Sequence, residues 1–566
     1  MTTLSAKHKR LLGFGCLLGF ILLLWAFPLL SHRLGHQNDI VVHLRWADQF
    51  SDAVKEGWLL PRWAHASRSG LGDPAFLFYQ PLFYYLTTGF ALLGLQPETV
   101  LICAAIVPYL LLGAIVYISV LRRYPNHHAL LGAMFVVGCP LLYFLSAYLA
   151  GFPWSLSIPF SLLFAIESTR DRPRPHILAP LLCLICLSHL LSGLITLLCT
   201  ALARLLFAFP GRNTIQGHLS WAAGVILGFA LSAFFVYPAL TQMHLITPSG
   251  WTEGNGFDWR RRFIFPIFTS VHWFAIQWPF AVLTLGMVIL VMSLKDNKAP
   301  TPMGIQAHRL ALIGVAAMLF ATELAYPLYA AISPLQKIQF PYRFIFLACI
   351  LANLALAIQL AEGAWARRGR AARAAIIVLV AAQCAQTAYL QWSLARHGER
   401  MPDRSSFMRG DFGQPEYVPA VRGPQWKAYV DNGKLTGECR HLGIVCNDVR
   451  QRSHDLSATI ETPRAVGLRM PLFAVQGWGV SVDGQQQALL ADPDTGLILV
   501  RLSPGRHLVT LRWSGLPVEV TGRAVSLAAL VILLALLLVS RLRRGREVAN
   551  VAFPAAPVYV KNRTRR

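Results

Sequence analysis

A small group of polar residues follows the first apolar run of the chain. Asp39, His43 and Arg45 stand close together there. If this stretch is helical, Asp39 and His43 share one face, because residues four apart on a helix are neighbours. A carboxylate beside an imidazole can act as a base, ligate a metal ion or form a hydrogen-bonded pair. The alternative is that these side chains only solvate a surface helix.

The loop around this group favours the chemical interpretation. It contains a further cation, Arg62, and many aromatic residues. Guanidinium groups bind phosphates through paired hydrogen bonds, and aromatic rings can contact a sugar or the lipid interface. An acid near guanidinium groups beside a bilayer suits a membrane-anchored phosphate substrate and a nucleophile that must lose a proton. The residues expected to be catalytic are Asp39 and His43, and those expected to contact substrate are Arg45, Arg62, Tyr79 and Gln80.

The composition indicates that this loop belongs to a membrane protein. Of 566 residues, 55% are hydrophobic and only 14% are charged, whereas soluble domains carry roughly 25% charged residues. The net charge of +24 would suggest nucleic-acid binding in a soluble protein. Here the basic residues stand in short clusters between apolar runs, which indicates membrane topology. We therefore expect no nucleic-acid partner.

The apolar runs predict about twelve transmembrane helices, because each approaches the roughly 20 residues that cross a bilayer. This count treats 177–209 as two short helices broken near His189, and it treats 76–94 as an interfacial or re-entrant helix. The segments then predicted to be cytoplasmic hold 24 Lys and Arg and 5 Asp and Glu, which gives +19 of the total +24. The runs lie near 11–30, 99–121, 129–147, 154–167, 177–209, 218–238, 271–294, 309–326, 342–361, 374–392 and 523–540.

Three long segments are left on the exterior face: 31–98, 239–270 and 393–522. The last of them reads as β structure, with an Asp483-Gly484 turn signal between alternating residues. We expect a β-sandwich-like domain at 393–522, following a membrane module at 1–392 and preceding a final helix and basic tail at 523–566. Cys439 and Cys446 are the only cysteines predicted outside the membrane, and we expect them to form a disulfide.

Motifs spread over most of the chain carry a family resemblance. They are Asp39 with His43 and Arg45, Pro61-Arg62-Trp63, Gly70-Leu71-Gly72-Asp73-Pro74, Phe78-Tyr79-Gln80-Pro81-Leu82, the stretch 333–344, Gly477-Trp478 with Val482-Asp483-Gly484, and Pro504-Gly505 with His507. The chain resembles bacterial membrane proteins labelled 6-pyruvoyl-tetrahydropterin synthase-related and the related YfhO-type proteins. This resemblance implies the GT-C superfamily of membrane glycosyltransferases and a location in the bacterial inner membrane, with the active site facing the periplasm.

The resemblance also implies a mechanism. GT-C enzymes take a sugar from a polyprenyl-phosphate donor and use an acid of the first exterior loop, which maps to Asp39 here. We expect an inverting transfer to a glycan, lipid or protein acceptor, with membrane lipids as further partners. The residue before Asp39 is Asn38 and not a second acid. The sequence therefore does not decide whether Asp39 and His43 hold a Mg or Mn ion. Arg343 is the first choice for the donor phosphate, Arg260 is the second, and His189 is a secondary candidate.

Two other functions fit parts of the sequence. A lipid-linked glycan transporter or flippase also has many spans, but the chain shows no internal repeat of the kind common in such folds. A non-catalytic envelope scaffold would explain the exterior β domain. Transfer or hydrolysis of a polyprenyl-phosphate sugar would separate the enzyme from both.

Overall fold

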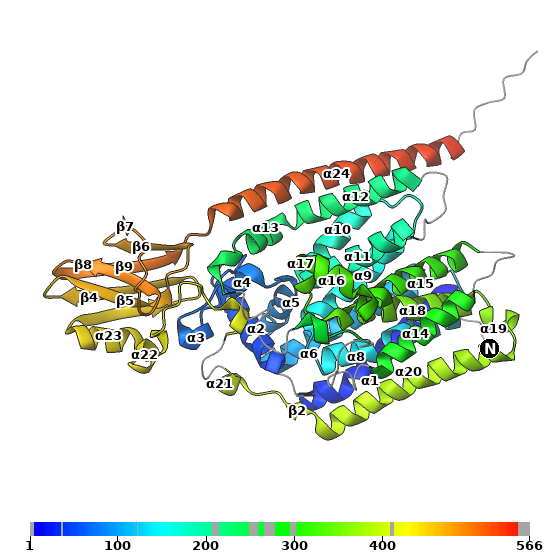
Figure 1. The fold of residues 1–566 in the computed structure, drawn as a ribbon, viewed down its shortest axis with the longest axis horizontal. Coiled ribbons are helices and arrows are strands. Elements are labelled where there is room, and N and C mark those ends of the chain that lie inside the picture. Colours follow the sequence, from blue (N-terminus) through cyan, green and yellow to red (C-terminus); the bar gives the residue numbers. More distant parts are fainter. Residues whose placement is uncertain are drawn as a thin grey trace, which may run out of the picture.

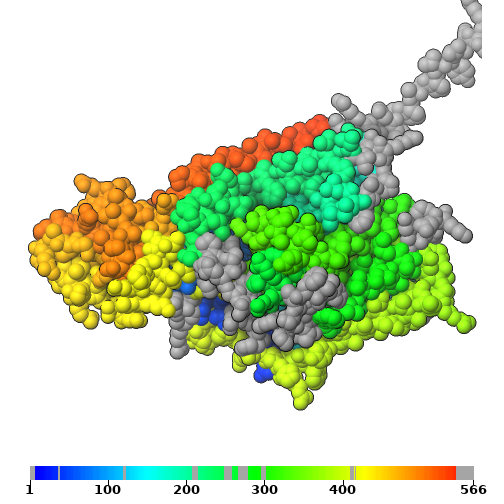
Figure 2. Space-filling model, viewed as in Figure 1, coloured from blue at the N-terminus to red at the C-terminus, as the bar shows by residue number. Residues whose placement is uncertain are grey.

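The computed structural model describes residues 5–35, 38–120, 123–206, 214–247, 258–264, 278–294, 301–407 and 413–552. A helical body carries a β domain (residues 420–516) at one end (Figures 1 and 2). Six helices of the described residues are long and apolar enough to cross a membrane, or eight when each of two bent pairs counts as one span. The chain is a multi-pass membrane protein. The expected count of twelve is not confirmed, because several apolar runs form helices too short for that length test.

The helical body surrounds one central helix. α18 (Phe344–Ala361) follows a 3-10 turn at Pro341–Arg343, and 89% of its apolar stretch is buried. A helix that is hydrophobic on every side belongs inside a bundle. α20 and α24 are only 17% and 11% buried over their apolar stretches, so they lie at the periphery. The helices of the body are α1 (Ala6–Ser31), α6 (Pro97–Ala114), α7 (Asn126–Val137), α8 (Pro140–Ala147), α9 (Phe152–Ser168), α10 (Pro175–Ser188), α11 (Leu190–Leu206), α12 (Thr214–Leu231), α13 (Ala233–Thr241), α14 (Trp278–Ser293), α15 (Pro302–Ala321), α18, α20 (Arg370–His397) and α24 (Pro517–Ala552).

Breaks in the helices place polar groups near the first loop. α10 and α11 are separate helices with His189 between them in extended conformation, as the two-helix interpretation of 177–209 expected. α7 and α8 meet at a bend of 44° just before Pro140, where proline lacks the amide proton a continuous helix needs. α12 and α13 meet at 77°.

The first loop begins with a long helix, α2 (Asn38–Lys55), and continues with two short ones, α4 (Ala75–Phe78) and α5 (Leu82–Ala91). The ten residues of α5 extend only about 15 Å, half of the roughly 30 Å of a hydrocarbon core. The segment 76–94 is therefore a pair of short helices broken at Tyr79–Pro81 and not a span. The remaining short helices are α3 (Ser67–Gly70), α16 (Tyr326–Ala331), α17 (Ser333–Gln336), α19 (Ala364–Arg367), α21 (Arg404–Phe407), α22 (Trp426–Asp431) and α23 (Lys434–Leu442).

The β domain has the strands that the turn signals predict. A five-stranded antiparallel sheet has the order β3-β4-β9-β6-β7, and β5 pairs with β8. The turn between β6 and β7 is Asp483-Gly484, both at positive φ (53° and 81°), which a tight hairpin turn of type I′ requires. The strands are β3 (Val445–Gln451), β4 (Asp455–Thr462), β5 (Val466–Phe473), β6 (Trp478–Val482), β7 (Gln485–Gln487), β8 (Leu497–Leu502) and β9 (Gly505–Trp513), and β1 (Arg33–Leu34) pairs with β2 (Glu399–Arg400) outside the domain.

The hairpin turn also has a titratable partner. His507 Nδ1 lies 2.7 Å from Asp483 Oδ2, and the Leu508 amide donates to Asp483 Oδ1 (2.8 Å). The hydrogen bond raises the pKa of His507 and lowers the pKa of Asp483. The pair therefore stabilises the turn between those two pKa values: the histidine contribution is lost as pH rises through its folded pKa, and the aspartate contribution is lost as pH falls.

We expect modification of His507 by diethylpyrocarbonate to begin at a higher pH in the wild type than in Asp483→Asn, because only the neutral imidazole reacts. Mass spectrometry of the peptide containing His507, in full-length protein from about one pH unit below to about two units above the ordinary histidine pKa, measures the shift. Identical pH profiles in the two proteins would contradict the pairing.

Candidate functional site

The candidate site centres on Asp39 in the first turn of α2. The side chain is exposed, and it lies near enough to Arg343 for the two charges to interact. Surrounding protein atoms raise the pKa of Asp39, and Arg343 partly offsets that shift. A carboxylate with a raised pKa is a better proton acceptor than an ordinary aspartate. The structure thus joins a possible base from the first loop to a cation about 300 residues later.

Arg343 is held at the start of the central helix. Its Nη1 donates to the Ile338 carbonyl (3.1 Å), and its guanidinium lies 4.6 Å from the Phe340 ring centroid and 5.6 Å from that of Trp154. Its Nε is buried and has no hydrogen-bond partner among the described residues. The Nε–H donor of Arg343 is therefore not used within the described structure.

An apolar cavity lies directly below Arg343, between α9, α11 and α18. It is small, about 20 Å³, and partly open to solvent. Its walls combine large apolar side chains with a few hydroxyl groups, and Arg343 is the one cationic side chain among the described residues that line it. The apolar residues are Trp154, Ile158, Ile195, Phe346, Leu347 and Ile350, and the hydroxyl residues are Ser157, Ser161, Ser192 and Thr196.

His189, at the break between α10 and α11, contacts two residues that line this cavity, Trp154 and Ser192. Its ring stacks on Trp154 at 5.5 Å and 12°, on the ring that Arg343 also contacts. Its Nδ1 lies 2.7 Å from Ser192 Oγ and accepts the Ser192 amide (3.2 Å). His189 and Arg343, which were predicted separately as site residues, thus contact the same ring, that of Trp154.

His43 lies behind Asp39, enclosed by aromatic rings. It is only 5% exposed, and its Nδ1 lies 2.8 Å from Tyr84 Oη. Burial lowers the pKa of His43 to about 3, so the imidazole is neutral. Among the described residues no group of three or more His, Cys, Asp or Glu is placed to hold a metal ion. The rings around His43 are those of Tyr79, Phe83, Tyr84 and Phe152.

Tyr79 lines the site beside Asp39, and its charge interactions include both Asp39 and Arg343. Its ring packs on Trp46 at 4.7 Å and on Tyr417 at 6.2 Å. Gln80 is the next residue and is partly exposed. Two neighbours of Tyr79, Glu416 and Tyr417, were not predicted from the sequence. An acid next to an aromatic residue in a segment expected on the exterior face could have marked them as site residues.

Arg45 and Arg260 lie in other surroundings. The Arg45 Nε donates to the Phe407 carbonyl, so this arginine anchors α21 on α2. Arg260 is exposed, pairs with Asp258 (3.4 Å) and lies over Trp259. Neither has a described interaction with Asp39 or Arg343, and their expected contact with substrate stays a prediction.

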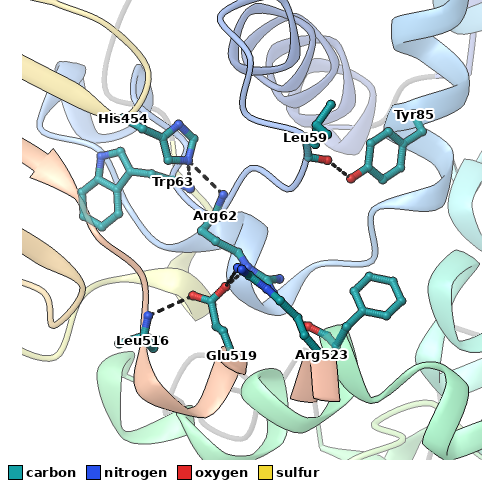
Figure 3. Close-up of polar contacts among 9 residues, drawn as sticks. Leu59, Arg62, Trp63, Tyr85, His454, Leu516, Glu519 and Arg523 are labelled. Carbon is teal, nitrogen blue, oxygen red and sulfur yellow. Dashed lines mark hydrogen bonds and ion pairs between the residues drawn. The ribbon is translucent and has the colours of Figure 1, made fainter. Parts of the chain in front are cut away.

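Arg62 is the centre of a junction between the first loop, the β domain and the last helix (Figure 3). The side chain is 1% exposed, its Nε donates to Glu519 Oε2 (3.0 Å), and its Nη2 donates to the Phe234 carbonyl (2.9 Å). The amides of Arg62 and Trp63 both donate to His454 Nε2 (3.0 and 3.2 Å). Burial lowers the pKa of His454 to about 3, which keeps that nitrogen free to accept. Arg62 is thus placed to fix architecture.

The β domain also contains a disulfide between Cys439 and Cys446. It links α23 to β3, the first strand of the larger sheet. The other cysteines of the chain are free.

Comparison with known proteins gives a distant structural likeness. The chain matches no protein-family model and no curated protein, so the family naming expected from sequence motifs finds no support there. Solved structures of arabinofuranosyltransferase AftD from Mycobacteria are similar, at 16% identity and a TM-score of 0.38 over 76% of this chain. A mutant of the same enzyme gives 16% identity and a TM-score of 0.43 over 90%. The chain spans 29% and 42% of those two structures, and at these values the likeness decides neither fold nor activity.

Proposed function

We propose that this protein is an integral-membrane glycosyltransferase of the GT-C type that takes its sugar from a polyprenyl-phosphate donor. The observation that carries the proposal is an exposed acid, Asp39, whose charge interacts with that of Arg343, a cation that lines an apolar cavity. A donor with a phosphate head and an isoprenoid tail has the matching distribution of charge and apolar surface. A phosphate beside Arg343 gains charge-assisted hydrogen bonds, and the start of an isoprenoid chain gains contact with the apolar walls of the cavity.

The reaction follows from this arrangement as one displacement. Asp39 accepts the proton of an acceptor hydroxyl, whose oxygen attacks the anomeric carbon of the donor sugar. The bond from that carbon to the phosphate oxygen breaks, and the polyprenyl phosphate leaves with the bonding electrons. Arg343 stabilises the negative charge that develops on the phosphate. Attack from the face opposite the leaving group inverts the anomeric configuration. The acceptor is an envelope glycan, lipid or protein on the exterior face.

A panel of polyprenyl-phosphate sugars tests the proposal. Purified protein in lipid nanodiscs is incubated with each donor, and both sugar transfer and donor hydrolysis are measured. Turnover of at least one donor supports the enzyme. Absence of turnover with every donor, by protein that is folded and inserted, would leave transport or scaffolding as the function.

We expect Arg343→Ala to raise the KM for the donor by about ten- to a hundredfold, because a hydrogen bond to a charged group contributes about 1.5–3 kcal/mol. Arg343→Lys keeps the charge and should recover part of the loss. The matched control is Arg396→Ala, an exposed arginine that also lies over an aromatic ring, Trp392. Equal donor KM values for Arg343→Ala and the wild type would remove Arg343 from the donor site.

A further inference from the structure

The segment before the β domain, residues 413–420, is fixed on two sides at the candidate site. On one side the Thr247 amide donates to the Val418 carbonyl (2.9 Å). On the other side the Arg68 guanidinium donates to the Gln414 carbonyl. Between these anchors the ring of Tyr417 packs against the aromatic residues around Tyr79. The segment is therefore a wall of the site and not a loose linker.

Backbone strain in the first loop positions the Arg68 anchor. Arg68 and Ser69 have φ angles of 53° and 56°, and Gly70 follows at 87°. Left-handed conformation costs a residue other than glycine about 1–2 kcal/mol, and it persists where surrounding contacts fix it. Arg68 is 7% exposed and lies 3.5 Å from Asp73, which is fully buried. The strained backbone thus places the Arg68 guanidinium where it bonds to the carbonyl of Gln414.

The segment presents one acid, Glu416, whose carboxylate is not fully satisfied. Glu416 Oε2 is buried and has no hydrogen-bond partner among the described residues. Leaving a buried acceptor unpaired costs about 1–3 kcal/mol, and more when the group is charged. Its charge interacts with those of Asp39 and Arg68, and with that of Tyr79. Glu416 therefore faces the same space as the proposed base.

Asp39 lies between opposite charges. Its carboxylate interacts with Arg343 on the donor side and with Glu416 on the other. The proposed base thus interacts both with the cation that lines the apolar cavity and with an acid on the segment before the β domain, and Arg68 lies beside that acid.

We propose that Glu416 binds the acceptor, accepting hydrogen bonds from the hydroxyl groups of an uncharged sugar, and that it disfavours acceptors that carry a negative charge there. This inference rests on the proposed transferase function and names the class of its second substrate. A carboxylate offers only acceptor sites, which match the donors of a polyol. An anionic acceptor would bring a like charge to the partly buried Glu416, and like-charge contacts at an interface cost several kcal/mol.

Two acceptor probes test the inference with a donor that the wild type uses. One is a neutral synthetic oligosaccharide, and the other is the same oligosaccharide oxidised to carry one uronate. We expect Glu416→Gln to raise the KM for the neutral probe by about tenfold, which corresponds to the loss of one hydrogen bond to a charged group. We also expect the ratio of kcat/KM for the neutral probe to that for the uronate probe to decrease. Donor hydrolysis by water, measured without either probe, should keep its wild-type rate.

Three variants and the wild type give decisive outcomes. Glu416→Asp keeps the carboxylate and should recover part of the acceptor affinity, whereas Glu461→Gln, a control at an exposed acid paired with Arg506, should change nothing. An unchanged acceptor KM and preference in Glu416→Gln overturns the inference alone, since the wild type still transfers sugar. Equal losses of acceptor use and donor hydrolysis also overturn it, because they indicate a structural role. A wild type that turns over no donor overturns the proposed function and this inference together.

Discussion

Asp39→Asn is expected to abolish sugar transfer in a protein that still folds and inserts. General-base catalysis contributes about a hundred- to ten-thousandfold to rate, and an amide of nearly the same shape cannot accept the proton. The substitution removes only a charge at an exposed site, so the expected change in stability is small. Initial rates of transfer, together with the yield of monodisperse protein in detergent, measure the two effects separately.

The pH dependence adds a second test of the same residue. Surrounding protein atoms hold the pKa of Asp39 above its usual 3.8, and the base is active only when deprotonated. Wild-type turnover should therefore fall as pH drops through this raised pKa. Asp48→Asn is the matched control: Asp48 lies on the same helix and pairs with Arg404 at the surface (2.9 Å). Retained transfer by Asp39→Asn, or an equal loss in Asp48→Asn, would contradict the assignment.

Glu519→Ala is expected to destabilise the protein more than any surface substitution. It leaves Arg62 buried without its counter-charge (Figure 3), and breaking a buried ion pair in this way costs about 3–5 kcal/mol. It also removes the acceptor of the Leu516 amide at the start of α24 (3.2 Å). Thermal unfolding in detergent and the rate of proteolytic release of the β domain measure the loss.

The same glutamate offers its own control. Arg523 bonds Glu519 Oε2 at 3.1 Å, yet its side chain is 60% exposed, and exposed ion pairs contribute only about 0–1 kcal/mol. Arg523→Ala should therefore unfold close to the wild-type temperature. The double variant Arg62→Met/Glu519→Leu should recover much of the stability that Glu519→Ala loses, because no buried charge remains. Equal unfolding temperatures for Glu519→Ala and Arg523→Ala would show that the buried pair contributes little.

Local sequence patterns correctly predicted features that depend on neighbouring residues, namely a hairpin turn and a helix break. The Asp483-Gly484 signal located a hairpin because only a few residues adopt the required positive φ. The hydropathy pattern located the helix break at His189. Asp39 and His43 do share one helix, but the packing of distant rings decides what each can do. Those rings enclose His43 and leave Asp39 accessible, and no spacing rule anticipates that difference.

The contacts that complete the site span most of the chain, and sequence patterns do not encode them. Arg62 meets Glu519 across 457 positions, and Arg68 meets Gln414 across 346. The sequence predicted that Arg62 contacts a phosphate, because a guanidinium group is suited to that role. Nothing near Arg62 in the sequence indicates that its partner is Glu519. Sequence reasoning missed Glu416 because its neighbours come from a distant part of the chain, the strained turn that contains Arg68.

The long separation of these contacts sets an order of events during synthesis. The first loop emerges from the ribosome early, but Arg62 has no counter-charge until Glu519 is made, and the Arg68 anchor has no carbonyl until Gln414 is made. Asp39 and Arg343 can already be inserted at that stage, yet the wall formed by residues 413–420 is missing. The first loop therefore gains its long-range partners only after residues far along the chain have been made.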